Sequence, residues 1–223
     1  MAANLSVVTI GAALKSKENL GARMGDVMSY LYMATCALEK FEDDGCPEDD
    51  LPLVEWSCEW ALEKAESAMA EFIPNYADYL KEASKKQPHL RIVNLARFLE
   101  KTALPKGRQL SKPSDALTLR AADIILNPGE ARDRLTAGVF NPEGEQDNPI
   151  AILEEAFKLV VATDPLEKAI RKALKGGQIH SADPDEAVEA GVISRWDAET
   201  LAKTRALVAK VVNVDDFSPQ GFK

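Results

Sequence analysis

The stretch GARMGDVMSYLYMATCALEKFEDDG, from Gly21 to Gly45, decides the fold of this chain. No charged residue occurs between Met28 and Leu38, and apolar side chains recur at steps of three and four residues, which is the period of a helix. One face of the helix contains Leu20, Met24, Val27, Met28, Leu31, Ala34 and Leu38, and a second face contains Tyr30, Met33, Ala37 and Phe41. A helix that is apolar over most of its circumference must be surrounded by other helices. We therefore expect a helix over residues 17–43 at the centre of an all-α fold.

Two glycines in this stretch lead to specific predictions. Gly25, inside the helix, costs about 1 kcal/mol relative to alanine, so we expect a neighbouring element to approach the backbone closely there. Gly45 follows the last turn and is expected to end the helix as its C′ residue.

A second amphipathic helix is predicted after an acidic loop. Its apolar positions, from Leu51 to Phe72, alternate at three- and four-residue steps, a spacing that favours packing against an antiparallel neighbour. Trp56 and Trp60 lie one turn apart and are predicted to pack between helices. Pro74 is expected to end this helix, because proline removes a backbone donor and clashes with the preceding turn.

The later helix starts share one sequence pattern. An Asn or Asp that can accept hydrogen bonds is followed by Pro at the first helical position and, except in one case, by Glu two residues later. The pattern occurs at residues 127–130, 148–149, 164–167 and 183–186. Ser194 and Asp197 are predicted to cap the last helix in a similar way, with Ser194 as the N-cap residue. Each cap contributes about 1 kcal/mol, so we interpret these carboxylates as caps and not as catalytic groups.

The whole pattern predicts an all-α fold, a helix bundle of long antiparallel helices with additional shorter helices packed around it. The expected helices cover residues 17–43, 51–73, 88–104, 114–126, 128–137, 149–163, 165–175, 184–190 and 195–212. The expected divisions are an N-terminal lead-in (1–16), a main helical domain (17–175), a small C-terminal helical lobe (178–212) and a tail (213–223). The Gly176–Gly177 pair is the expected hinge before the lobe.

Composition and charge exclude some classes of function. Of the 223 residues, 46% are hydrophobic and 28% charged, which is ordinary for a soluble protein. The formal charge of −9 argues against a nucleic-acid partner, because phosphate binding needs a basic footprint. The sequence contains neither an apolar run of about eighteen residues nor a secretory signal, so we expect a cytoplasmic protein. Of the three cysteines, Cys36 and Cys58 are expected as small core residues.

Positive charge is concentrated between residues 81 and 112, where nine Lys and Arg residues face only Glu82 and Glu100. This segment is interpreted either as a solvated surface or as a face for anionic lipid or an acidic partner. Basic residues on its irregular loop can hold phosphate or carboxylate, although the loop can also merely turn the chain between two helices. The candidate residues for an anion or partner contact are Lys106, Gly107, Arg108, Ser114 and Asp115.

We assign no catalytic, cofactor-binding or metal-binding residue. The sequence has no glycine-rich nucleotide loop after a strand. His89 and His180 are far apart in sequence and are expected at the surface. Ser111 and Ser114 have no adjacent base and are expected to serve in capping the helix that starts at Asp115.

Several longer segments carry a resemblance to a known family. They are LGARMGDVMSYLYMATCALEKFEDDG (20–45), CPEDDLPLVEWSCEWAL (46–62), LPKGRQLSKPSD (104–115), ARDRLTAGVF (131–140), NPIAILEEAF (148–157), TDPLEKAIRKAL (163–174) and NVDDF (213–217). In this order they resemble the C-terminal region of the FadE-type bacterial acyl-CoA dehydrogenases of fatty-acid β-oxidation.

The resemblance implies an activity for the full-length enzyme, the FAD-dependent formation of the 2,3-double bond of fatty acyl-CoA. In that family the catalytic parts lie upstream, so we expect no flavin in this chain alone. The implied partners are the catalytic domains, in cis or in trans, together with a peripheral contact at the inner membrane and an oligomer. The region would serve assembly, membrane proximity or substrate-channel shaping. The alternative is a free-standing helical interaction module without catalysis.

Overall fold

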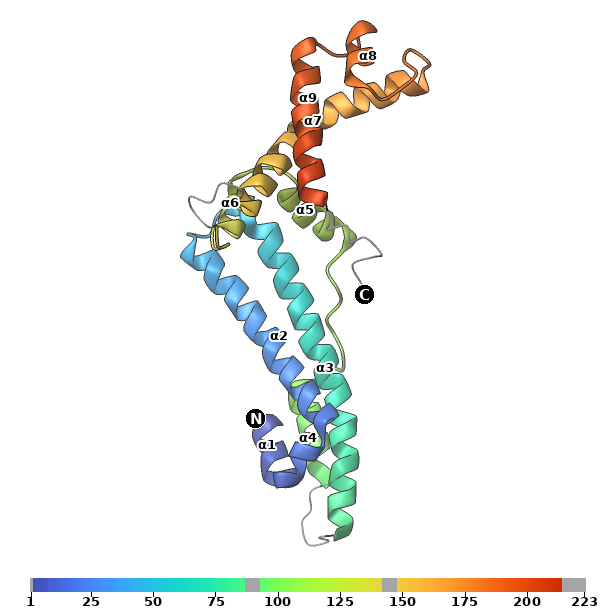
Figure 1. Cartoon of the computed structure of the whole chain (residues 1–223). Coiled ribbons are helices and arrows are strands. Elements are labelled where there is room, and N and C mark those ends of the chain that lie inside the picture. The colour runs from blue at the N-terminus through green and yellow to red at the C-terminus, as the bar shows by residue number, and fades with distance from the viewer. Residues whose placement is uncertain (1, 87–92, 142–147, 214–223) are drawn as a thin grey trace, which may run out of the picture. The chain divides into compact units, whose positions relative to one another are not determined.

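The computed structural model describes residues 2–86, 93–141 and 148–213. Within these ranges the regular structure is helical, with no β-strand, which confirms the all-α prediction (Figure 1). The chain divides into two compact units, Met1–Ile125 and Leu126–Lys223. His89, the start of the helix expected over 88–104 and the tail after Asn213 lie outside the described residues.

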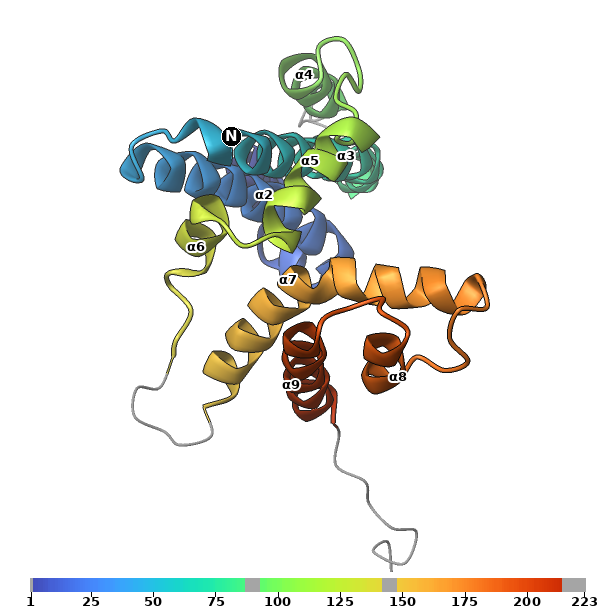
Figure 2. The ribbon, with the colours of Figure 1, turned by 90° about the horizontal axis from the view of Figure 1, so that it is seen from above.

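The first unit is built on a hairpin of two long helices. Its elements are α1 (Ala2–Ile10), the 3-10 helix η1 (Gly11–Ser16), α2 (Glu18–Asp43), the 3-10 helix η2 (Glu48–Asp50), α3 (Leu51–Lys86), α4 (Val93–Ala103) and α5 (Asp115–Leu126), whose last residue belongs to the second unit. α2 and α3 run in opposite directions, since Arg23 contacts Glu71 whereas Tyr30 contacts Trp60. Seen from above, α2 and α3 lie side by side and α4 lies next to α3 (Figure 2).

The core of this unit lies where α2, α3 and α4 meet. Its buried members are Leu20, Phe72, Ile73, Tyr76, Leu80, Ala96 and Leu99. The rings of Phe72 and Tyr76 stack with their centroids 5.3 Å apart. Because the cluster draws on three helices, it fixes α4 on α3 and so positions the loop that follows α4.

The turn after α2 ends the helix as the sequence predicts. Gly45 has φ of +85°, in the left-handed region that favours glycine. Its N–H donates to the carbonyl of Glu42 at 3.0 Å, and the N–H of Cys46 donates to the carbonyl of Phe41 at 2.9 Å. These two bonds are those of a Schellman motif, which confirms Gly45 as the C′ residue.

Two predicted helix ends at prolines are wrong. α3 continues through Pro74, and α7 (Pro149–Lys175) continues through Pro165. A proline inside a helix costs about 3 kcal/mol. Burial of one large apolar side chain contributes about 1.5–3 kcal/mol, and Phe72 and Leu80 are both fully buried on either side of Pro74. Packing along the whole helix therefore outweighs the local penalty, and residues 149–163 and 165–175 form one helix instead of two.

The second unit packs three helices around a small core. Its elements are α6 (Glu130–Thr136), α7, α8 (Pro184–Glu189) and α9 (Arg195–Val212). The buried cluster consists of Ile170, Ala173, Ile179, Ala187, Ile193, Ala198 and Leu201, from α7, α8, α9 and the segments between them. Gly177, with φ of +72°, ends α7 in the same way that Gly45 ends α2. The cluster includes residues on both sides of the Gly176–Gly177 pair, and the division between units lies instead after Ile125.

Most of the predicted caps in this unit are confirmed. The Asn148 side chain accepts from the N–H groups of Ile150 and Ala151, and that of Asp183 accepts from Asp185. Ser194 and Asp197 form a complete capping box at the start of α9. The cap expected at Asn127 is wrong, because α6 starts only at Glu130 and its N-cap residue is Gly129, which has no side chain to accept a hydrogen bond. The cap expected at Asp164 is also wrong, because Asp164 lies inside α7 and no helix starts there.

Candidate functional site

The loop between α4 and α5 is fastened to α3 by two glutamates. The Nη2 of Arg108 donates to the Oε1 of Glu63 at 2.7 Å. The carboxylate of Glu66 accepts from the backbone N–H groups of Gln109 at 2.8 Å and Leu110 at 2.9 Å. Gly107 permits the turn before these contacts, since its φ of +74° lies in the left-handed region. The guanidinium predicted to contact an external anion is thus already paired with an anion of α3.

Glu63 is an unusually buried carboxylate, only 4% exposed. Its Oε2 is buried and has no hydrogen-bond partner in the described part of the chain, and the Nζ of Lys64 lies 4.0 Å away. A buried charge is costly unless it is paired. Arg108, which is about half exposed, therefore compensates Glu63 and ties the loop to the core helix.

The remaining predicted site residues lie apart from this ion pair. The Ser114 hydroxyl accepts from the N–H of Leu117 at 3.1 Å, which confirms its capping role, and Asp115 is the first residue of α5. Lys106 is exposed and makes no ion pair with a carboxylate among the described residues. Gly107 and Arg108 border a groove, whereas Lys106, Ser114 and Asp115 are not among its lining residues.

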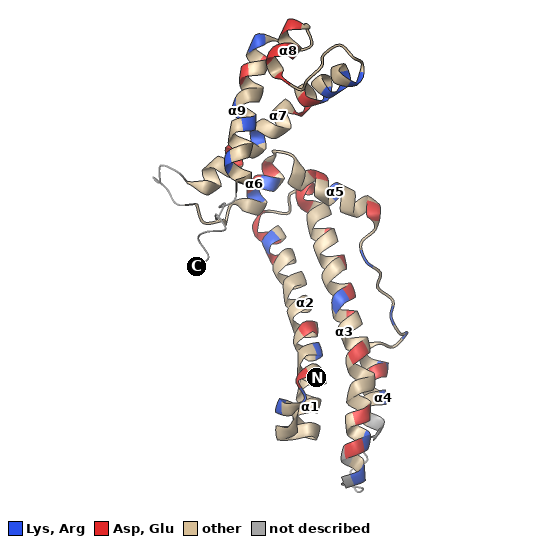
Figure 3. Ribbon diagram, turned by 45° about the vertical axis from the view of Figure 1, so that its right-hand side comes forward, with Lys and Arg blue, Asp and Glu red and all other residues tan. Residues whose placement is uncertain are grey.

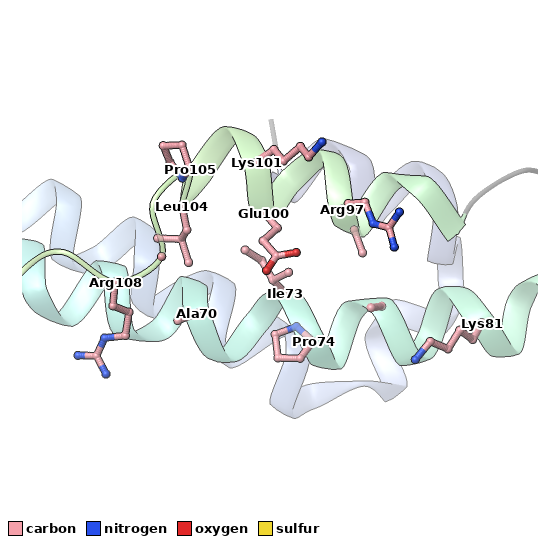
Figure 4. Close-up of a pocket in the computed structure, with 13 residues that line it drawn as sticks. Ala70, Ile73, Pro74, Lys81, Arg97, Glu100, Lys101, Leu104, Pro105 and Arg108 are labelled. Carbon is pink, nitrogen blue, oxygen red and sulfur yellow. The ribbon is translucent and has the colours of Figure 1, made fainter.

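The groove lies between α3 and α4 and has a volume of about 850 Å³. Its apolar lining is formed by Ala70, Ile73, Pro74, Ala77, Ala96, Leu104 and Pro105. Its charged lining is formed by Lys81, Arg97, Lys101, Arg108 and Glu100 (Figure 4). Figure 4 shows Glu100 directed from α4 toward Pro74 on α3. The arrangement suits an anionic group next to an apolar one, and its lining contains no Ser, Thr, Cys or His side chain.

A second surface is the outer side of α2, where the sequence prediction is partly wrong. Only Leu20, Val27 and Ala34 of this helix are buried. Met28 is 62% and Tyr32 70% exposed, and Leu31, Met33 and Leu38 are also exposed. The helix is thus only partly covered: Tyr32 and Met33 lie on the side away from Leu20, Val27 and Ala34, whereas Leu31 and Leu38 lie on the same face as these three and are still about half exposed.

Two further predictions about α2 fail for the same reason. A Cβ atom added at Gly25 would meet no heavy atom of the described residues within 4 Å, so none of the described elements approaches it closely. Cys36 is exposed and not a core residue, while Cys58 is half-buried. The predicted packing of the tryptophans between helices is confirmed. The ring of Trp60 on α3 meets the ring of Tyr30 on α2 edge-on, with 5.5 Å between their centroids. Trp60 also stacks on Trp56, with 6.1 Å between the ring centroids.

Comparison with known families decides where the chain belongs. The family model described as "Acyl-CoA dehydrogenase, C-terminal, bacterial type" matches residues 1–217. This chain belongs to that family. It is therefore the C-terminal domain of an acyl-CoA dehydrogenase. No solved structure matches the chain.

The groove of this acyl-CoA dehydrogenase domain offers cations for the phosphates of FAD, the cofactor that the family generally uses, but not an aromatic surface for its flavin ring. A flavin is a flat, largely apolar ring system joined to phosphates, and pockets for such cofactors are lined mainly by apolar and aromatic groups. The groove lining has no aromatic ring and a single glycine, Gly107. We assign no step at the flavin to these residues.

Carboxylates of the second unit have structural roles. The guanidinium of Arg132 makes two hydrogen bonds of 2.8 Å to Glu154 and lies 4.0 Å above the Phe157 ring. The hydrogen bonds from Arg132 lower the pKa of Glu154. The pKa of Glu186 is lowered by the Ser181 hydroxyl and by backbone N–H donors. A lowered pKa keeps both groups ionised near neutral pH, which does not suit a general acid.

Neither a metal site nor a membrane span emerges from the described ranges. Within them, no three His, Cys, Asp or Glu side chains are grouped to hold a metal ion. The helices in these ranges also include none that is both long and apolar enough to cross a bilayer.

Glu63 and Glu66 are the site residues that sequence reasoning missed. They lie in the middle of α3, and their partners in the loop are more than forty positions away. No periodicity or spacing in the sequence links these positions, so the contact can be identified only from the three-dimensional structure.

Proposed function

We propose that this chain is the C-terminal helical domain of a FadE-type enzyme, which oxidises fatty acyl-CoA to its 2,3-unsaturated product with FAD in β-oxidation. We further propose that the domain serves assembly and that the redox chemistry belongs to the catalytic part of the enzyme. The family match over residues 1–217 supports the first statement at the level of acyl-CoA dehydrogenases. The open apolar side of α2 supports the second.

The exposure of α2 carries the proposal for assembly. Large exposed apolar patches on soluble proteins mark interaction sites. The five exposed side chains Met28, Leu31, Tyr32, Met33 and Leu38 lie within eleven residues that include no charge. Each is 46–70% exposed, so covering the remaining area would contribute roughly 1–2 kcal/mol per side chain. A partner surface that covers this side would therefore bind firmly.

A binding experiment with matched variants tests the role in assembly. The assembled enzyme is purified through a tag on its catalytic part, with this chain in native form or with Tyr32→Glu. A charge at Tyr32 should release the chain from the assembly, because it places a carboxylate in the covered surface. Leu119→Glu is the control, since Leu119 of α5 is equally exposed (70%) but lies outside α2. Equal retention of both variants would contradict the proposal.

A spectroscopic experiment tests the location of the chemistry. The visible absorption of the purified chain is recorded before and after addition of a long-chain acyl-CoA. We expect no flavin band. A band that bleaches with acyl-CoA would place a redox site in this domain. If the chain neither carries flavin nor binds a catalytic part, the free-standing interaction module becomes the better description.

A second candidate function is a peripheral contact with anionic lipid on the cytoplasmic side of the inner membrane. The observation that favours it is the set of exposed cations Arg97, Lys101 and Lys106, which make no ion pair among the described residues. Each basic residue near an anionic membrane contributes about 1 kcal/mol. The variant Arg97→Glu/Lys106→Glu should lose co-sedimentation with vesicles rich in phosphatidylserine. Arg108 is left intact because its replacement would leave the Glu63 carboxylate without its ion-pair partner. Unchanged binding of the variant to the vesicles would refute this candidate function.

A further inference from the structure

We infer that the groove between α3 and α4 binds a free fatty acid, with the carboxylate between Lys81 and Arg97 and the chain along the apolar lining. The inference goes beyond the proposed function and does not depend on it, because no residue of α2 lines the groove. It follows from the open apolar lining, from the net charge of the lining and from the two cations at one end.

The lining offers an apolar surface that the described chain leaves open. Pro74 and Pro105 are exposed, and Leu104 is half-buried. On α3 the lining extends from Ala70 to Lys81, which is roughly 16 Å along the helix. The volume of about 850 Å³ lies within the range of small-molecule sites. An extended hydrocarbon chain can therefore lie along the groove.

Two of the four cations in the lining are already paired. The Nζ of Lys81 lies 2.9 Å from the carboxylate of Asp78, and the Nη2 of Arg108 lies 2.7 Å from that of Glu63. Each pair is neutral overall and adds no net charge for a ligand. Lys81 and Arg108 nevertheless keep N–H donors that have no partner among the described residues.

The other charged lining residues leave a single positive charge. Arg97 and Lys101 are opposed by Glu100, and none of the three has an ion-pair partner among the described residues. Two positive charges against one negative charge leave +1, which complements one carboxylate. The head group of acyl-CoA carries several phosphate charges and an adenine ring, and the lining has no aromatic ring for adenine to stack on. A fatty acid therefore fits the groove better than its CoA thioester does.

The cations at one end of the groove are placed to hold the carboxylate. Figure 4 shows Lys81 on α3 and Arg97 on α4 toward the same end, and Leu104 and Pro105 toward the other end. A carboxylate between the two cations would accept hydrogen bonds from the ammonium and the guanidinium, which are stronger than bonds from neutral donors. The chain would then run past Ile73 toward Leu104.

Glu100 works against this ligand and so provides a test of opposite sign. Its carboxylate is directed toward Pro74, over the path of the chain (Figure 4). Because Glu100 is exposed, its side chain can turn into solvent when the ligand binds, at a cost in affinity. Removing the charge of Glu100 should therefore strengthen binding, whereas removing the charge of Arg97 should weaken it.

Displacement of a fluorescent fatty acid, cis-parinarate, from the purified chain measures the affinity. Dodecanoate below its micelle concentration should bind roughly 15-fold more tightly than octanoate, because each of the four additional CH₂ groups, half covered in an open groove, contributes a factor of about two. Dodecyltrimethylammonium has the same chain with a positive head and should not displace the probe. Dodecanoyl-CoA should bind more weakly than dodecanoate. Equal displacement by the cationic amphiphile would overturn the inference.

Three variants locate the site. Arg97→Gln should weaken the binding of dodecanoate by about tenfold, and Glu100→Gln should strengthen it. Lys106→Gln is the control, since Lys106 is exposed but does not line the groove, and its affinity should be unchanged. Circular dichroism of each variant checks that the helices remain. Arg97→Gln and Lys106→Gln that bind alike would overturn the inference.

The outer side of α2 is the competing surface for an apolar chain. Figure 3 shows residues of both charge signs on the part of α3 beside α4, whereas the middle of α2 is free of charge. A fatty acid held on α2 would be lost in Tyr32→Glu and retained in Arg97→Gln, which would overturn the inference and leave the role in assembly standing.

Vesicles rich in phosphatidylserine separate the free fatty acid from a membrane lipid. They should not displace the probe, because a groove that holds one chain does not fit the surface of a bilayer. If they displace it as well as dodecanoate does, the cations contact lipid headgroups and the free fatty acid is refuted as the ligand.

Discussion

Replacing Arg108 by Gln should destabilise the first unit through the carboxylate that it leaves behind. Glu63 is 4% exposed, and its Oε1 accepts from Arg108 at 2.7 Å. Removing one member of a buried ion pair costs about 3–5 kcal/mol. Because Arg108 is about half exposed, water screens the pair, and we expect a smaller loss of roughly 1–2 kcal/mol in the free energy of unfolding.

Urea denaturation followed by tryptophan fluorescence measures this loss. Trp56 and Trp60 lie in the first unit, and the exposed Trp196 of the second unit can be replaced by Phe so that the signal reports one unit. The control is Lys106→Gln, an exposed neighbour without an ion pair among the described residues, which should change stability by less than about 0.5 kcal/mol.

A double variant provides the decisive comparison. In Glu63→Gln/Arg108→Gln no unpaired charge remains, so most of the loss should be recovered. The reasoning is refuted if Arg108→Gln costs no more than Lys106→Gln, or if the double variant is as unstable as the single one.

Three other substitutions test separate parts of the structure. Pro74→Ala should stabilise the first unit by about 1 kcal/mol or more, since α3 continues through this position and gains a hydrogen bond; a loss in urea denaturation would contradict this. Ser194→Ala should cost the second unit about 1 kcal/mol in thermal unfolding by removing the capping box of α9, whereas an unchanged midpoint would argue against that cap. The lowered pKa of Glu154 means that its pair with Arg132 stabilises the fold above the unfolded pKa of about 4.3 and that this stability is lost as pH falls through the folded value. In Glu154→Gln the free energy of unfolding should therefore fall less steeply as the pH is lowered. An unchanged pH dependence would show that the pair does not contribute to stability.

Local chemistry in the sequence predicted the helix ends well where one side chain decides them. Asn148, Asp183 and Ser194 cap the helices that follow, and Gly45 ends α2, because each of these contacts joins residues only a few positions apart. The same rules failed at Pro74, where the penalty of one missing hydrogen bond is smaller than the gain from burying side chains on both sides of the proline.

The sequence identified the basic segment around the loop but not how its side chains are arranged. The concentration of basic residues marks the loop and the groove correctly as a cationic region. The pairing of Arg108 with Glu63 depends on how α4 turns the chain back onto α3, which no local pattern encodes. For α2, the apolar circumference is real, but the chain itself covers only one side of it, which is why Met28 and Tyr32 are exposed.

The rate at which Cys36 reacts with an alkylating reagent reports whether the outer side of α2 is covered in the assembled enzyme. Cys36 is exposed on the outer side of α2, and Cys46, exposed in the turn after α2, provides an internal reference. Mass spectrometry would compare both rates in the assembled enzyme and in Tyr32→Glu. We expect Cys36 to be protected in the assembly and to react freely in the variant, with the rate for Cys46 unchanged. Equal reactivity of Cys36 in both would show that the outer side of α2 remains open and would contradict its role in assembly.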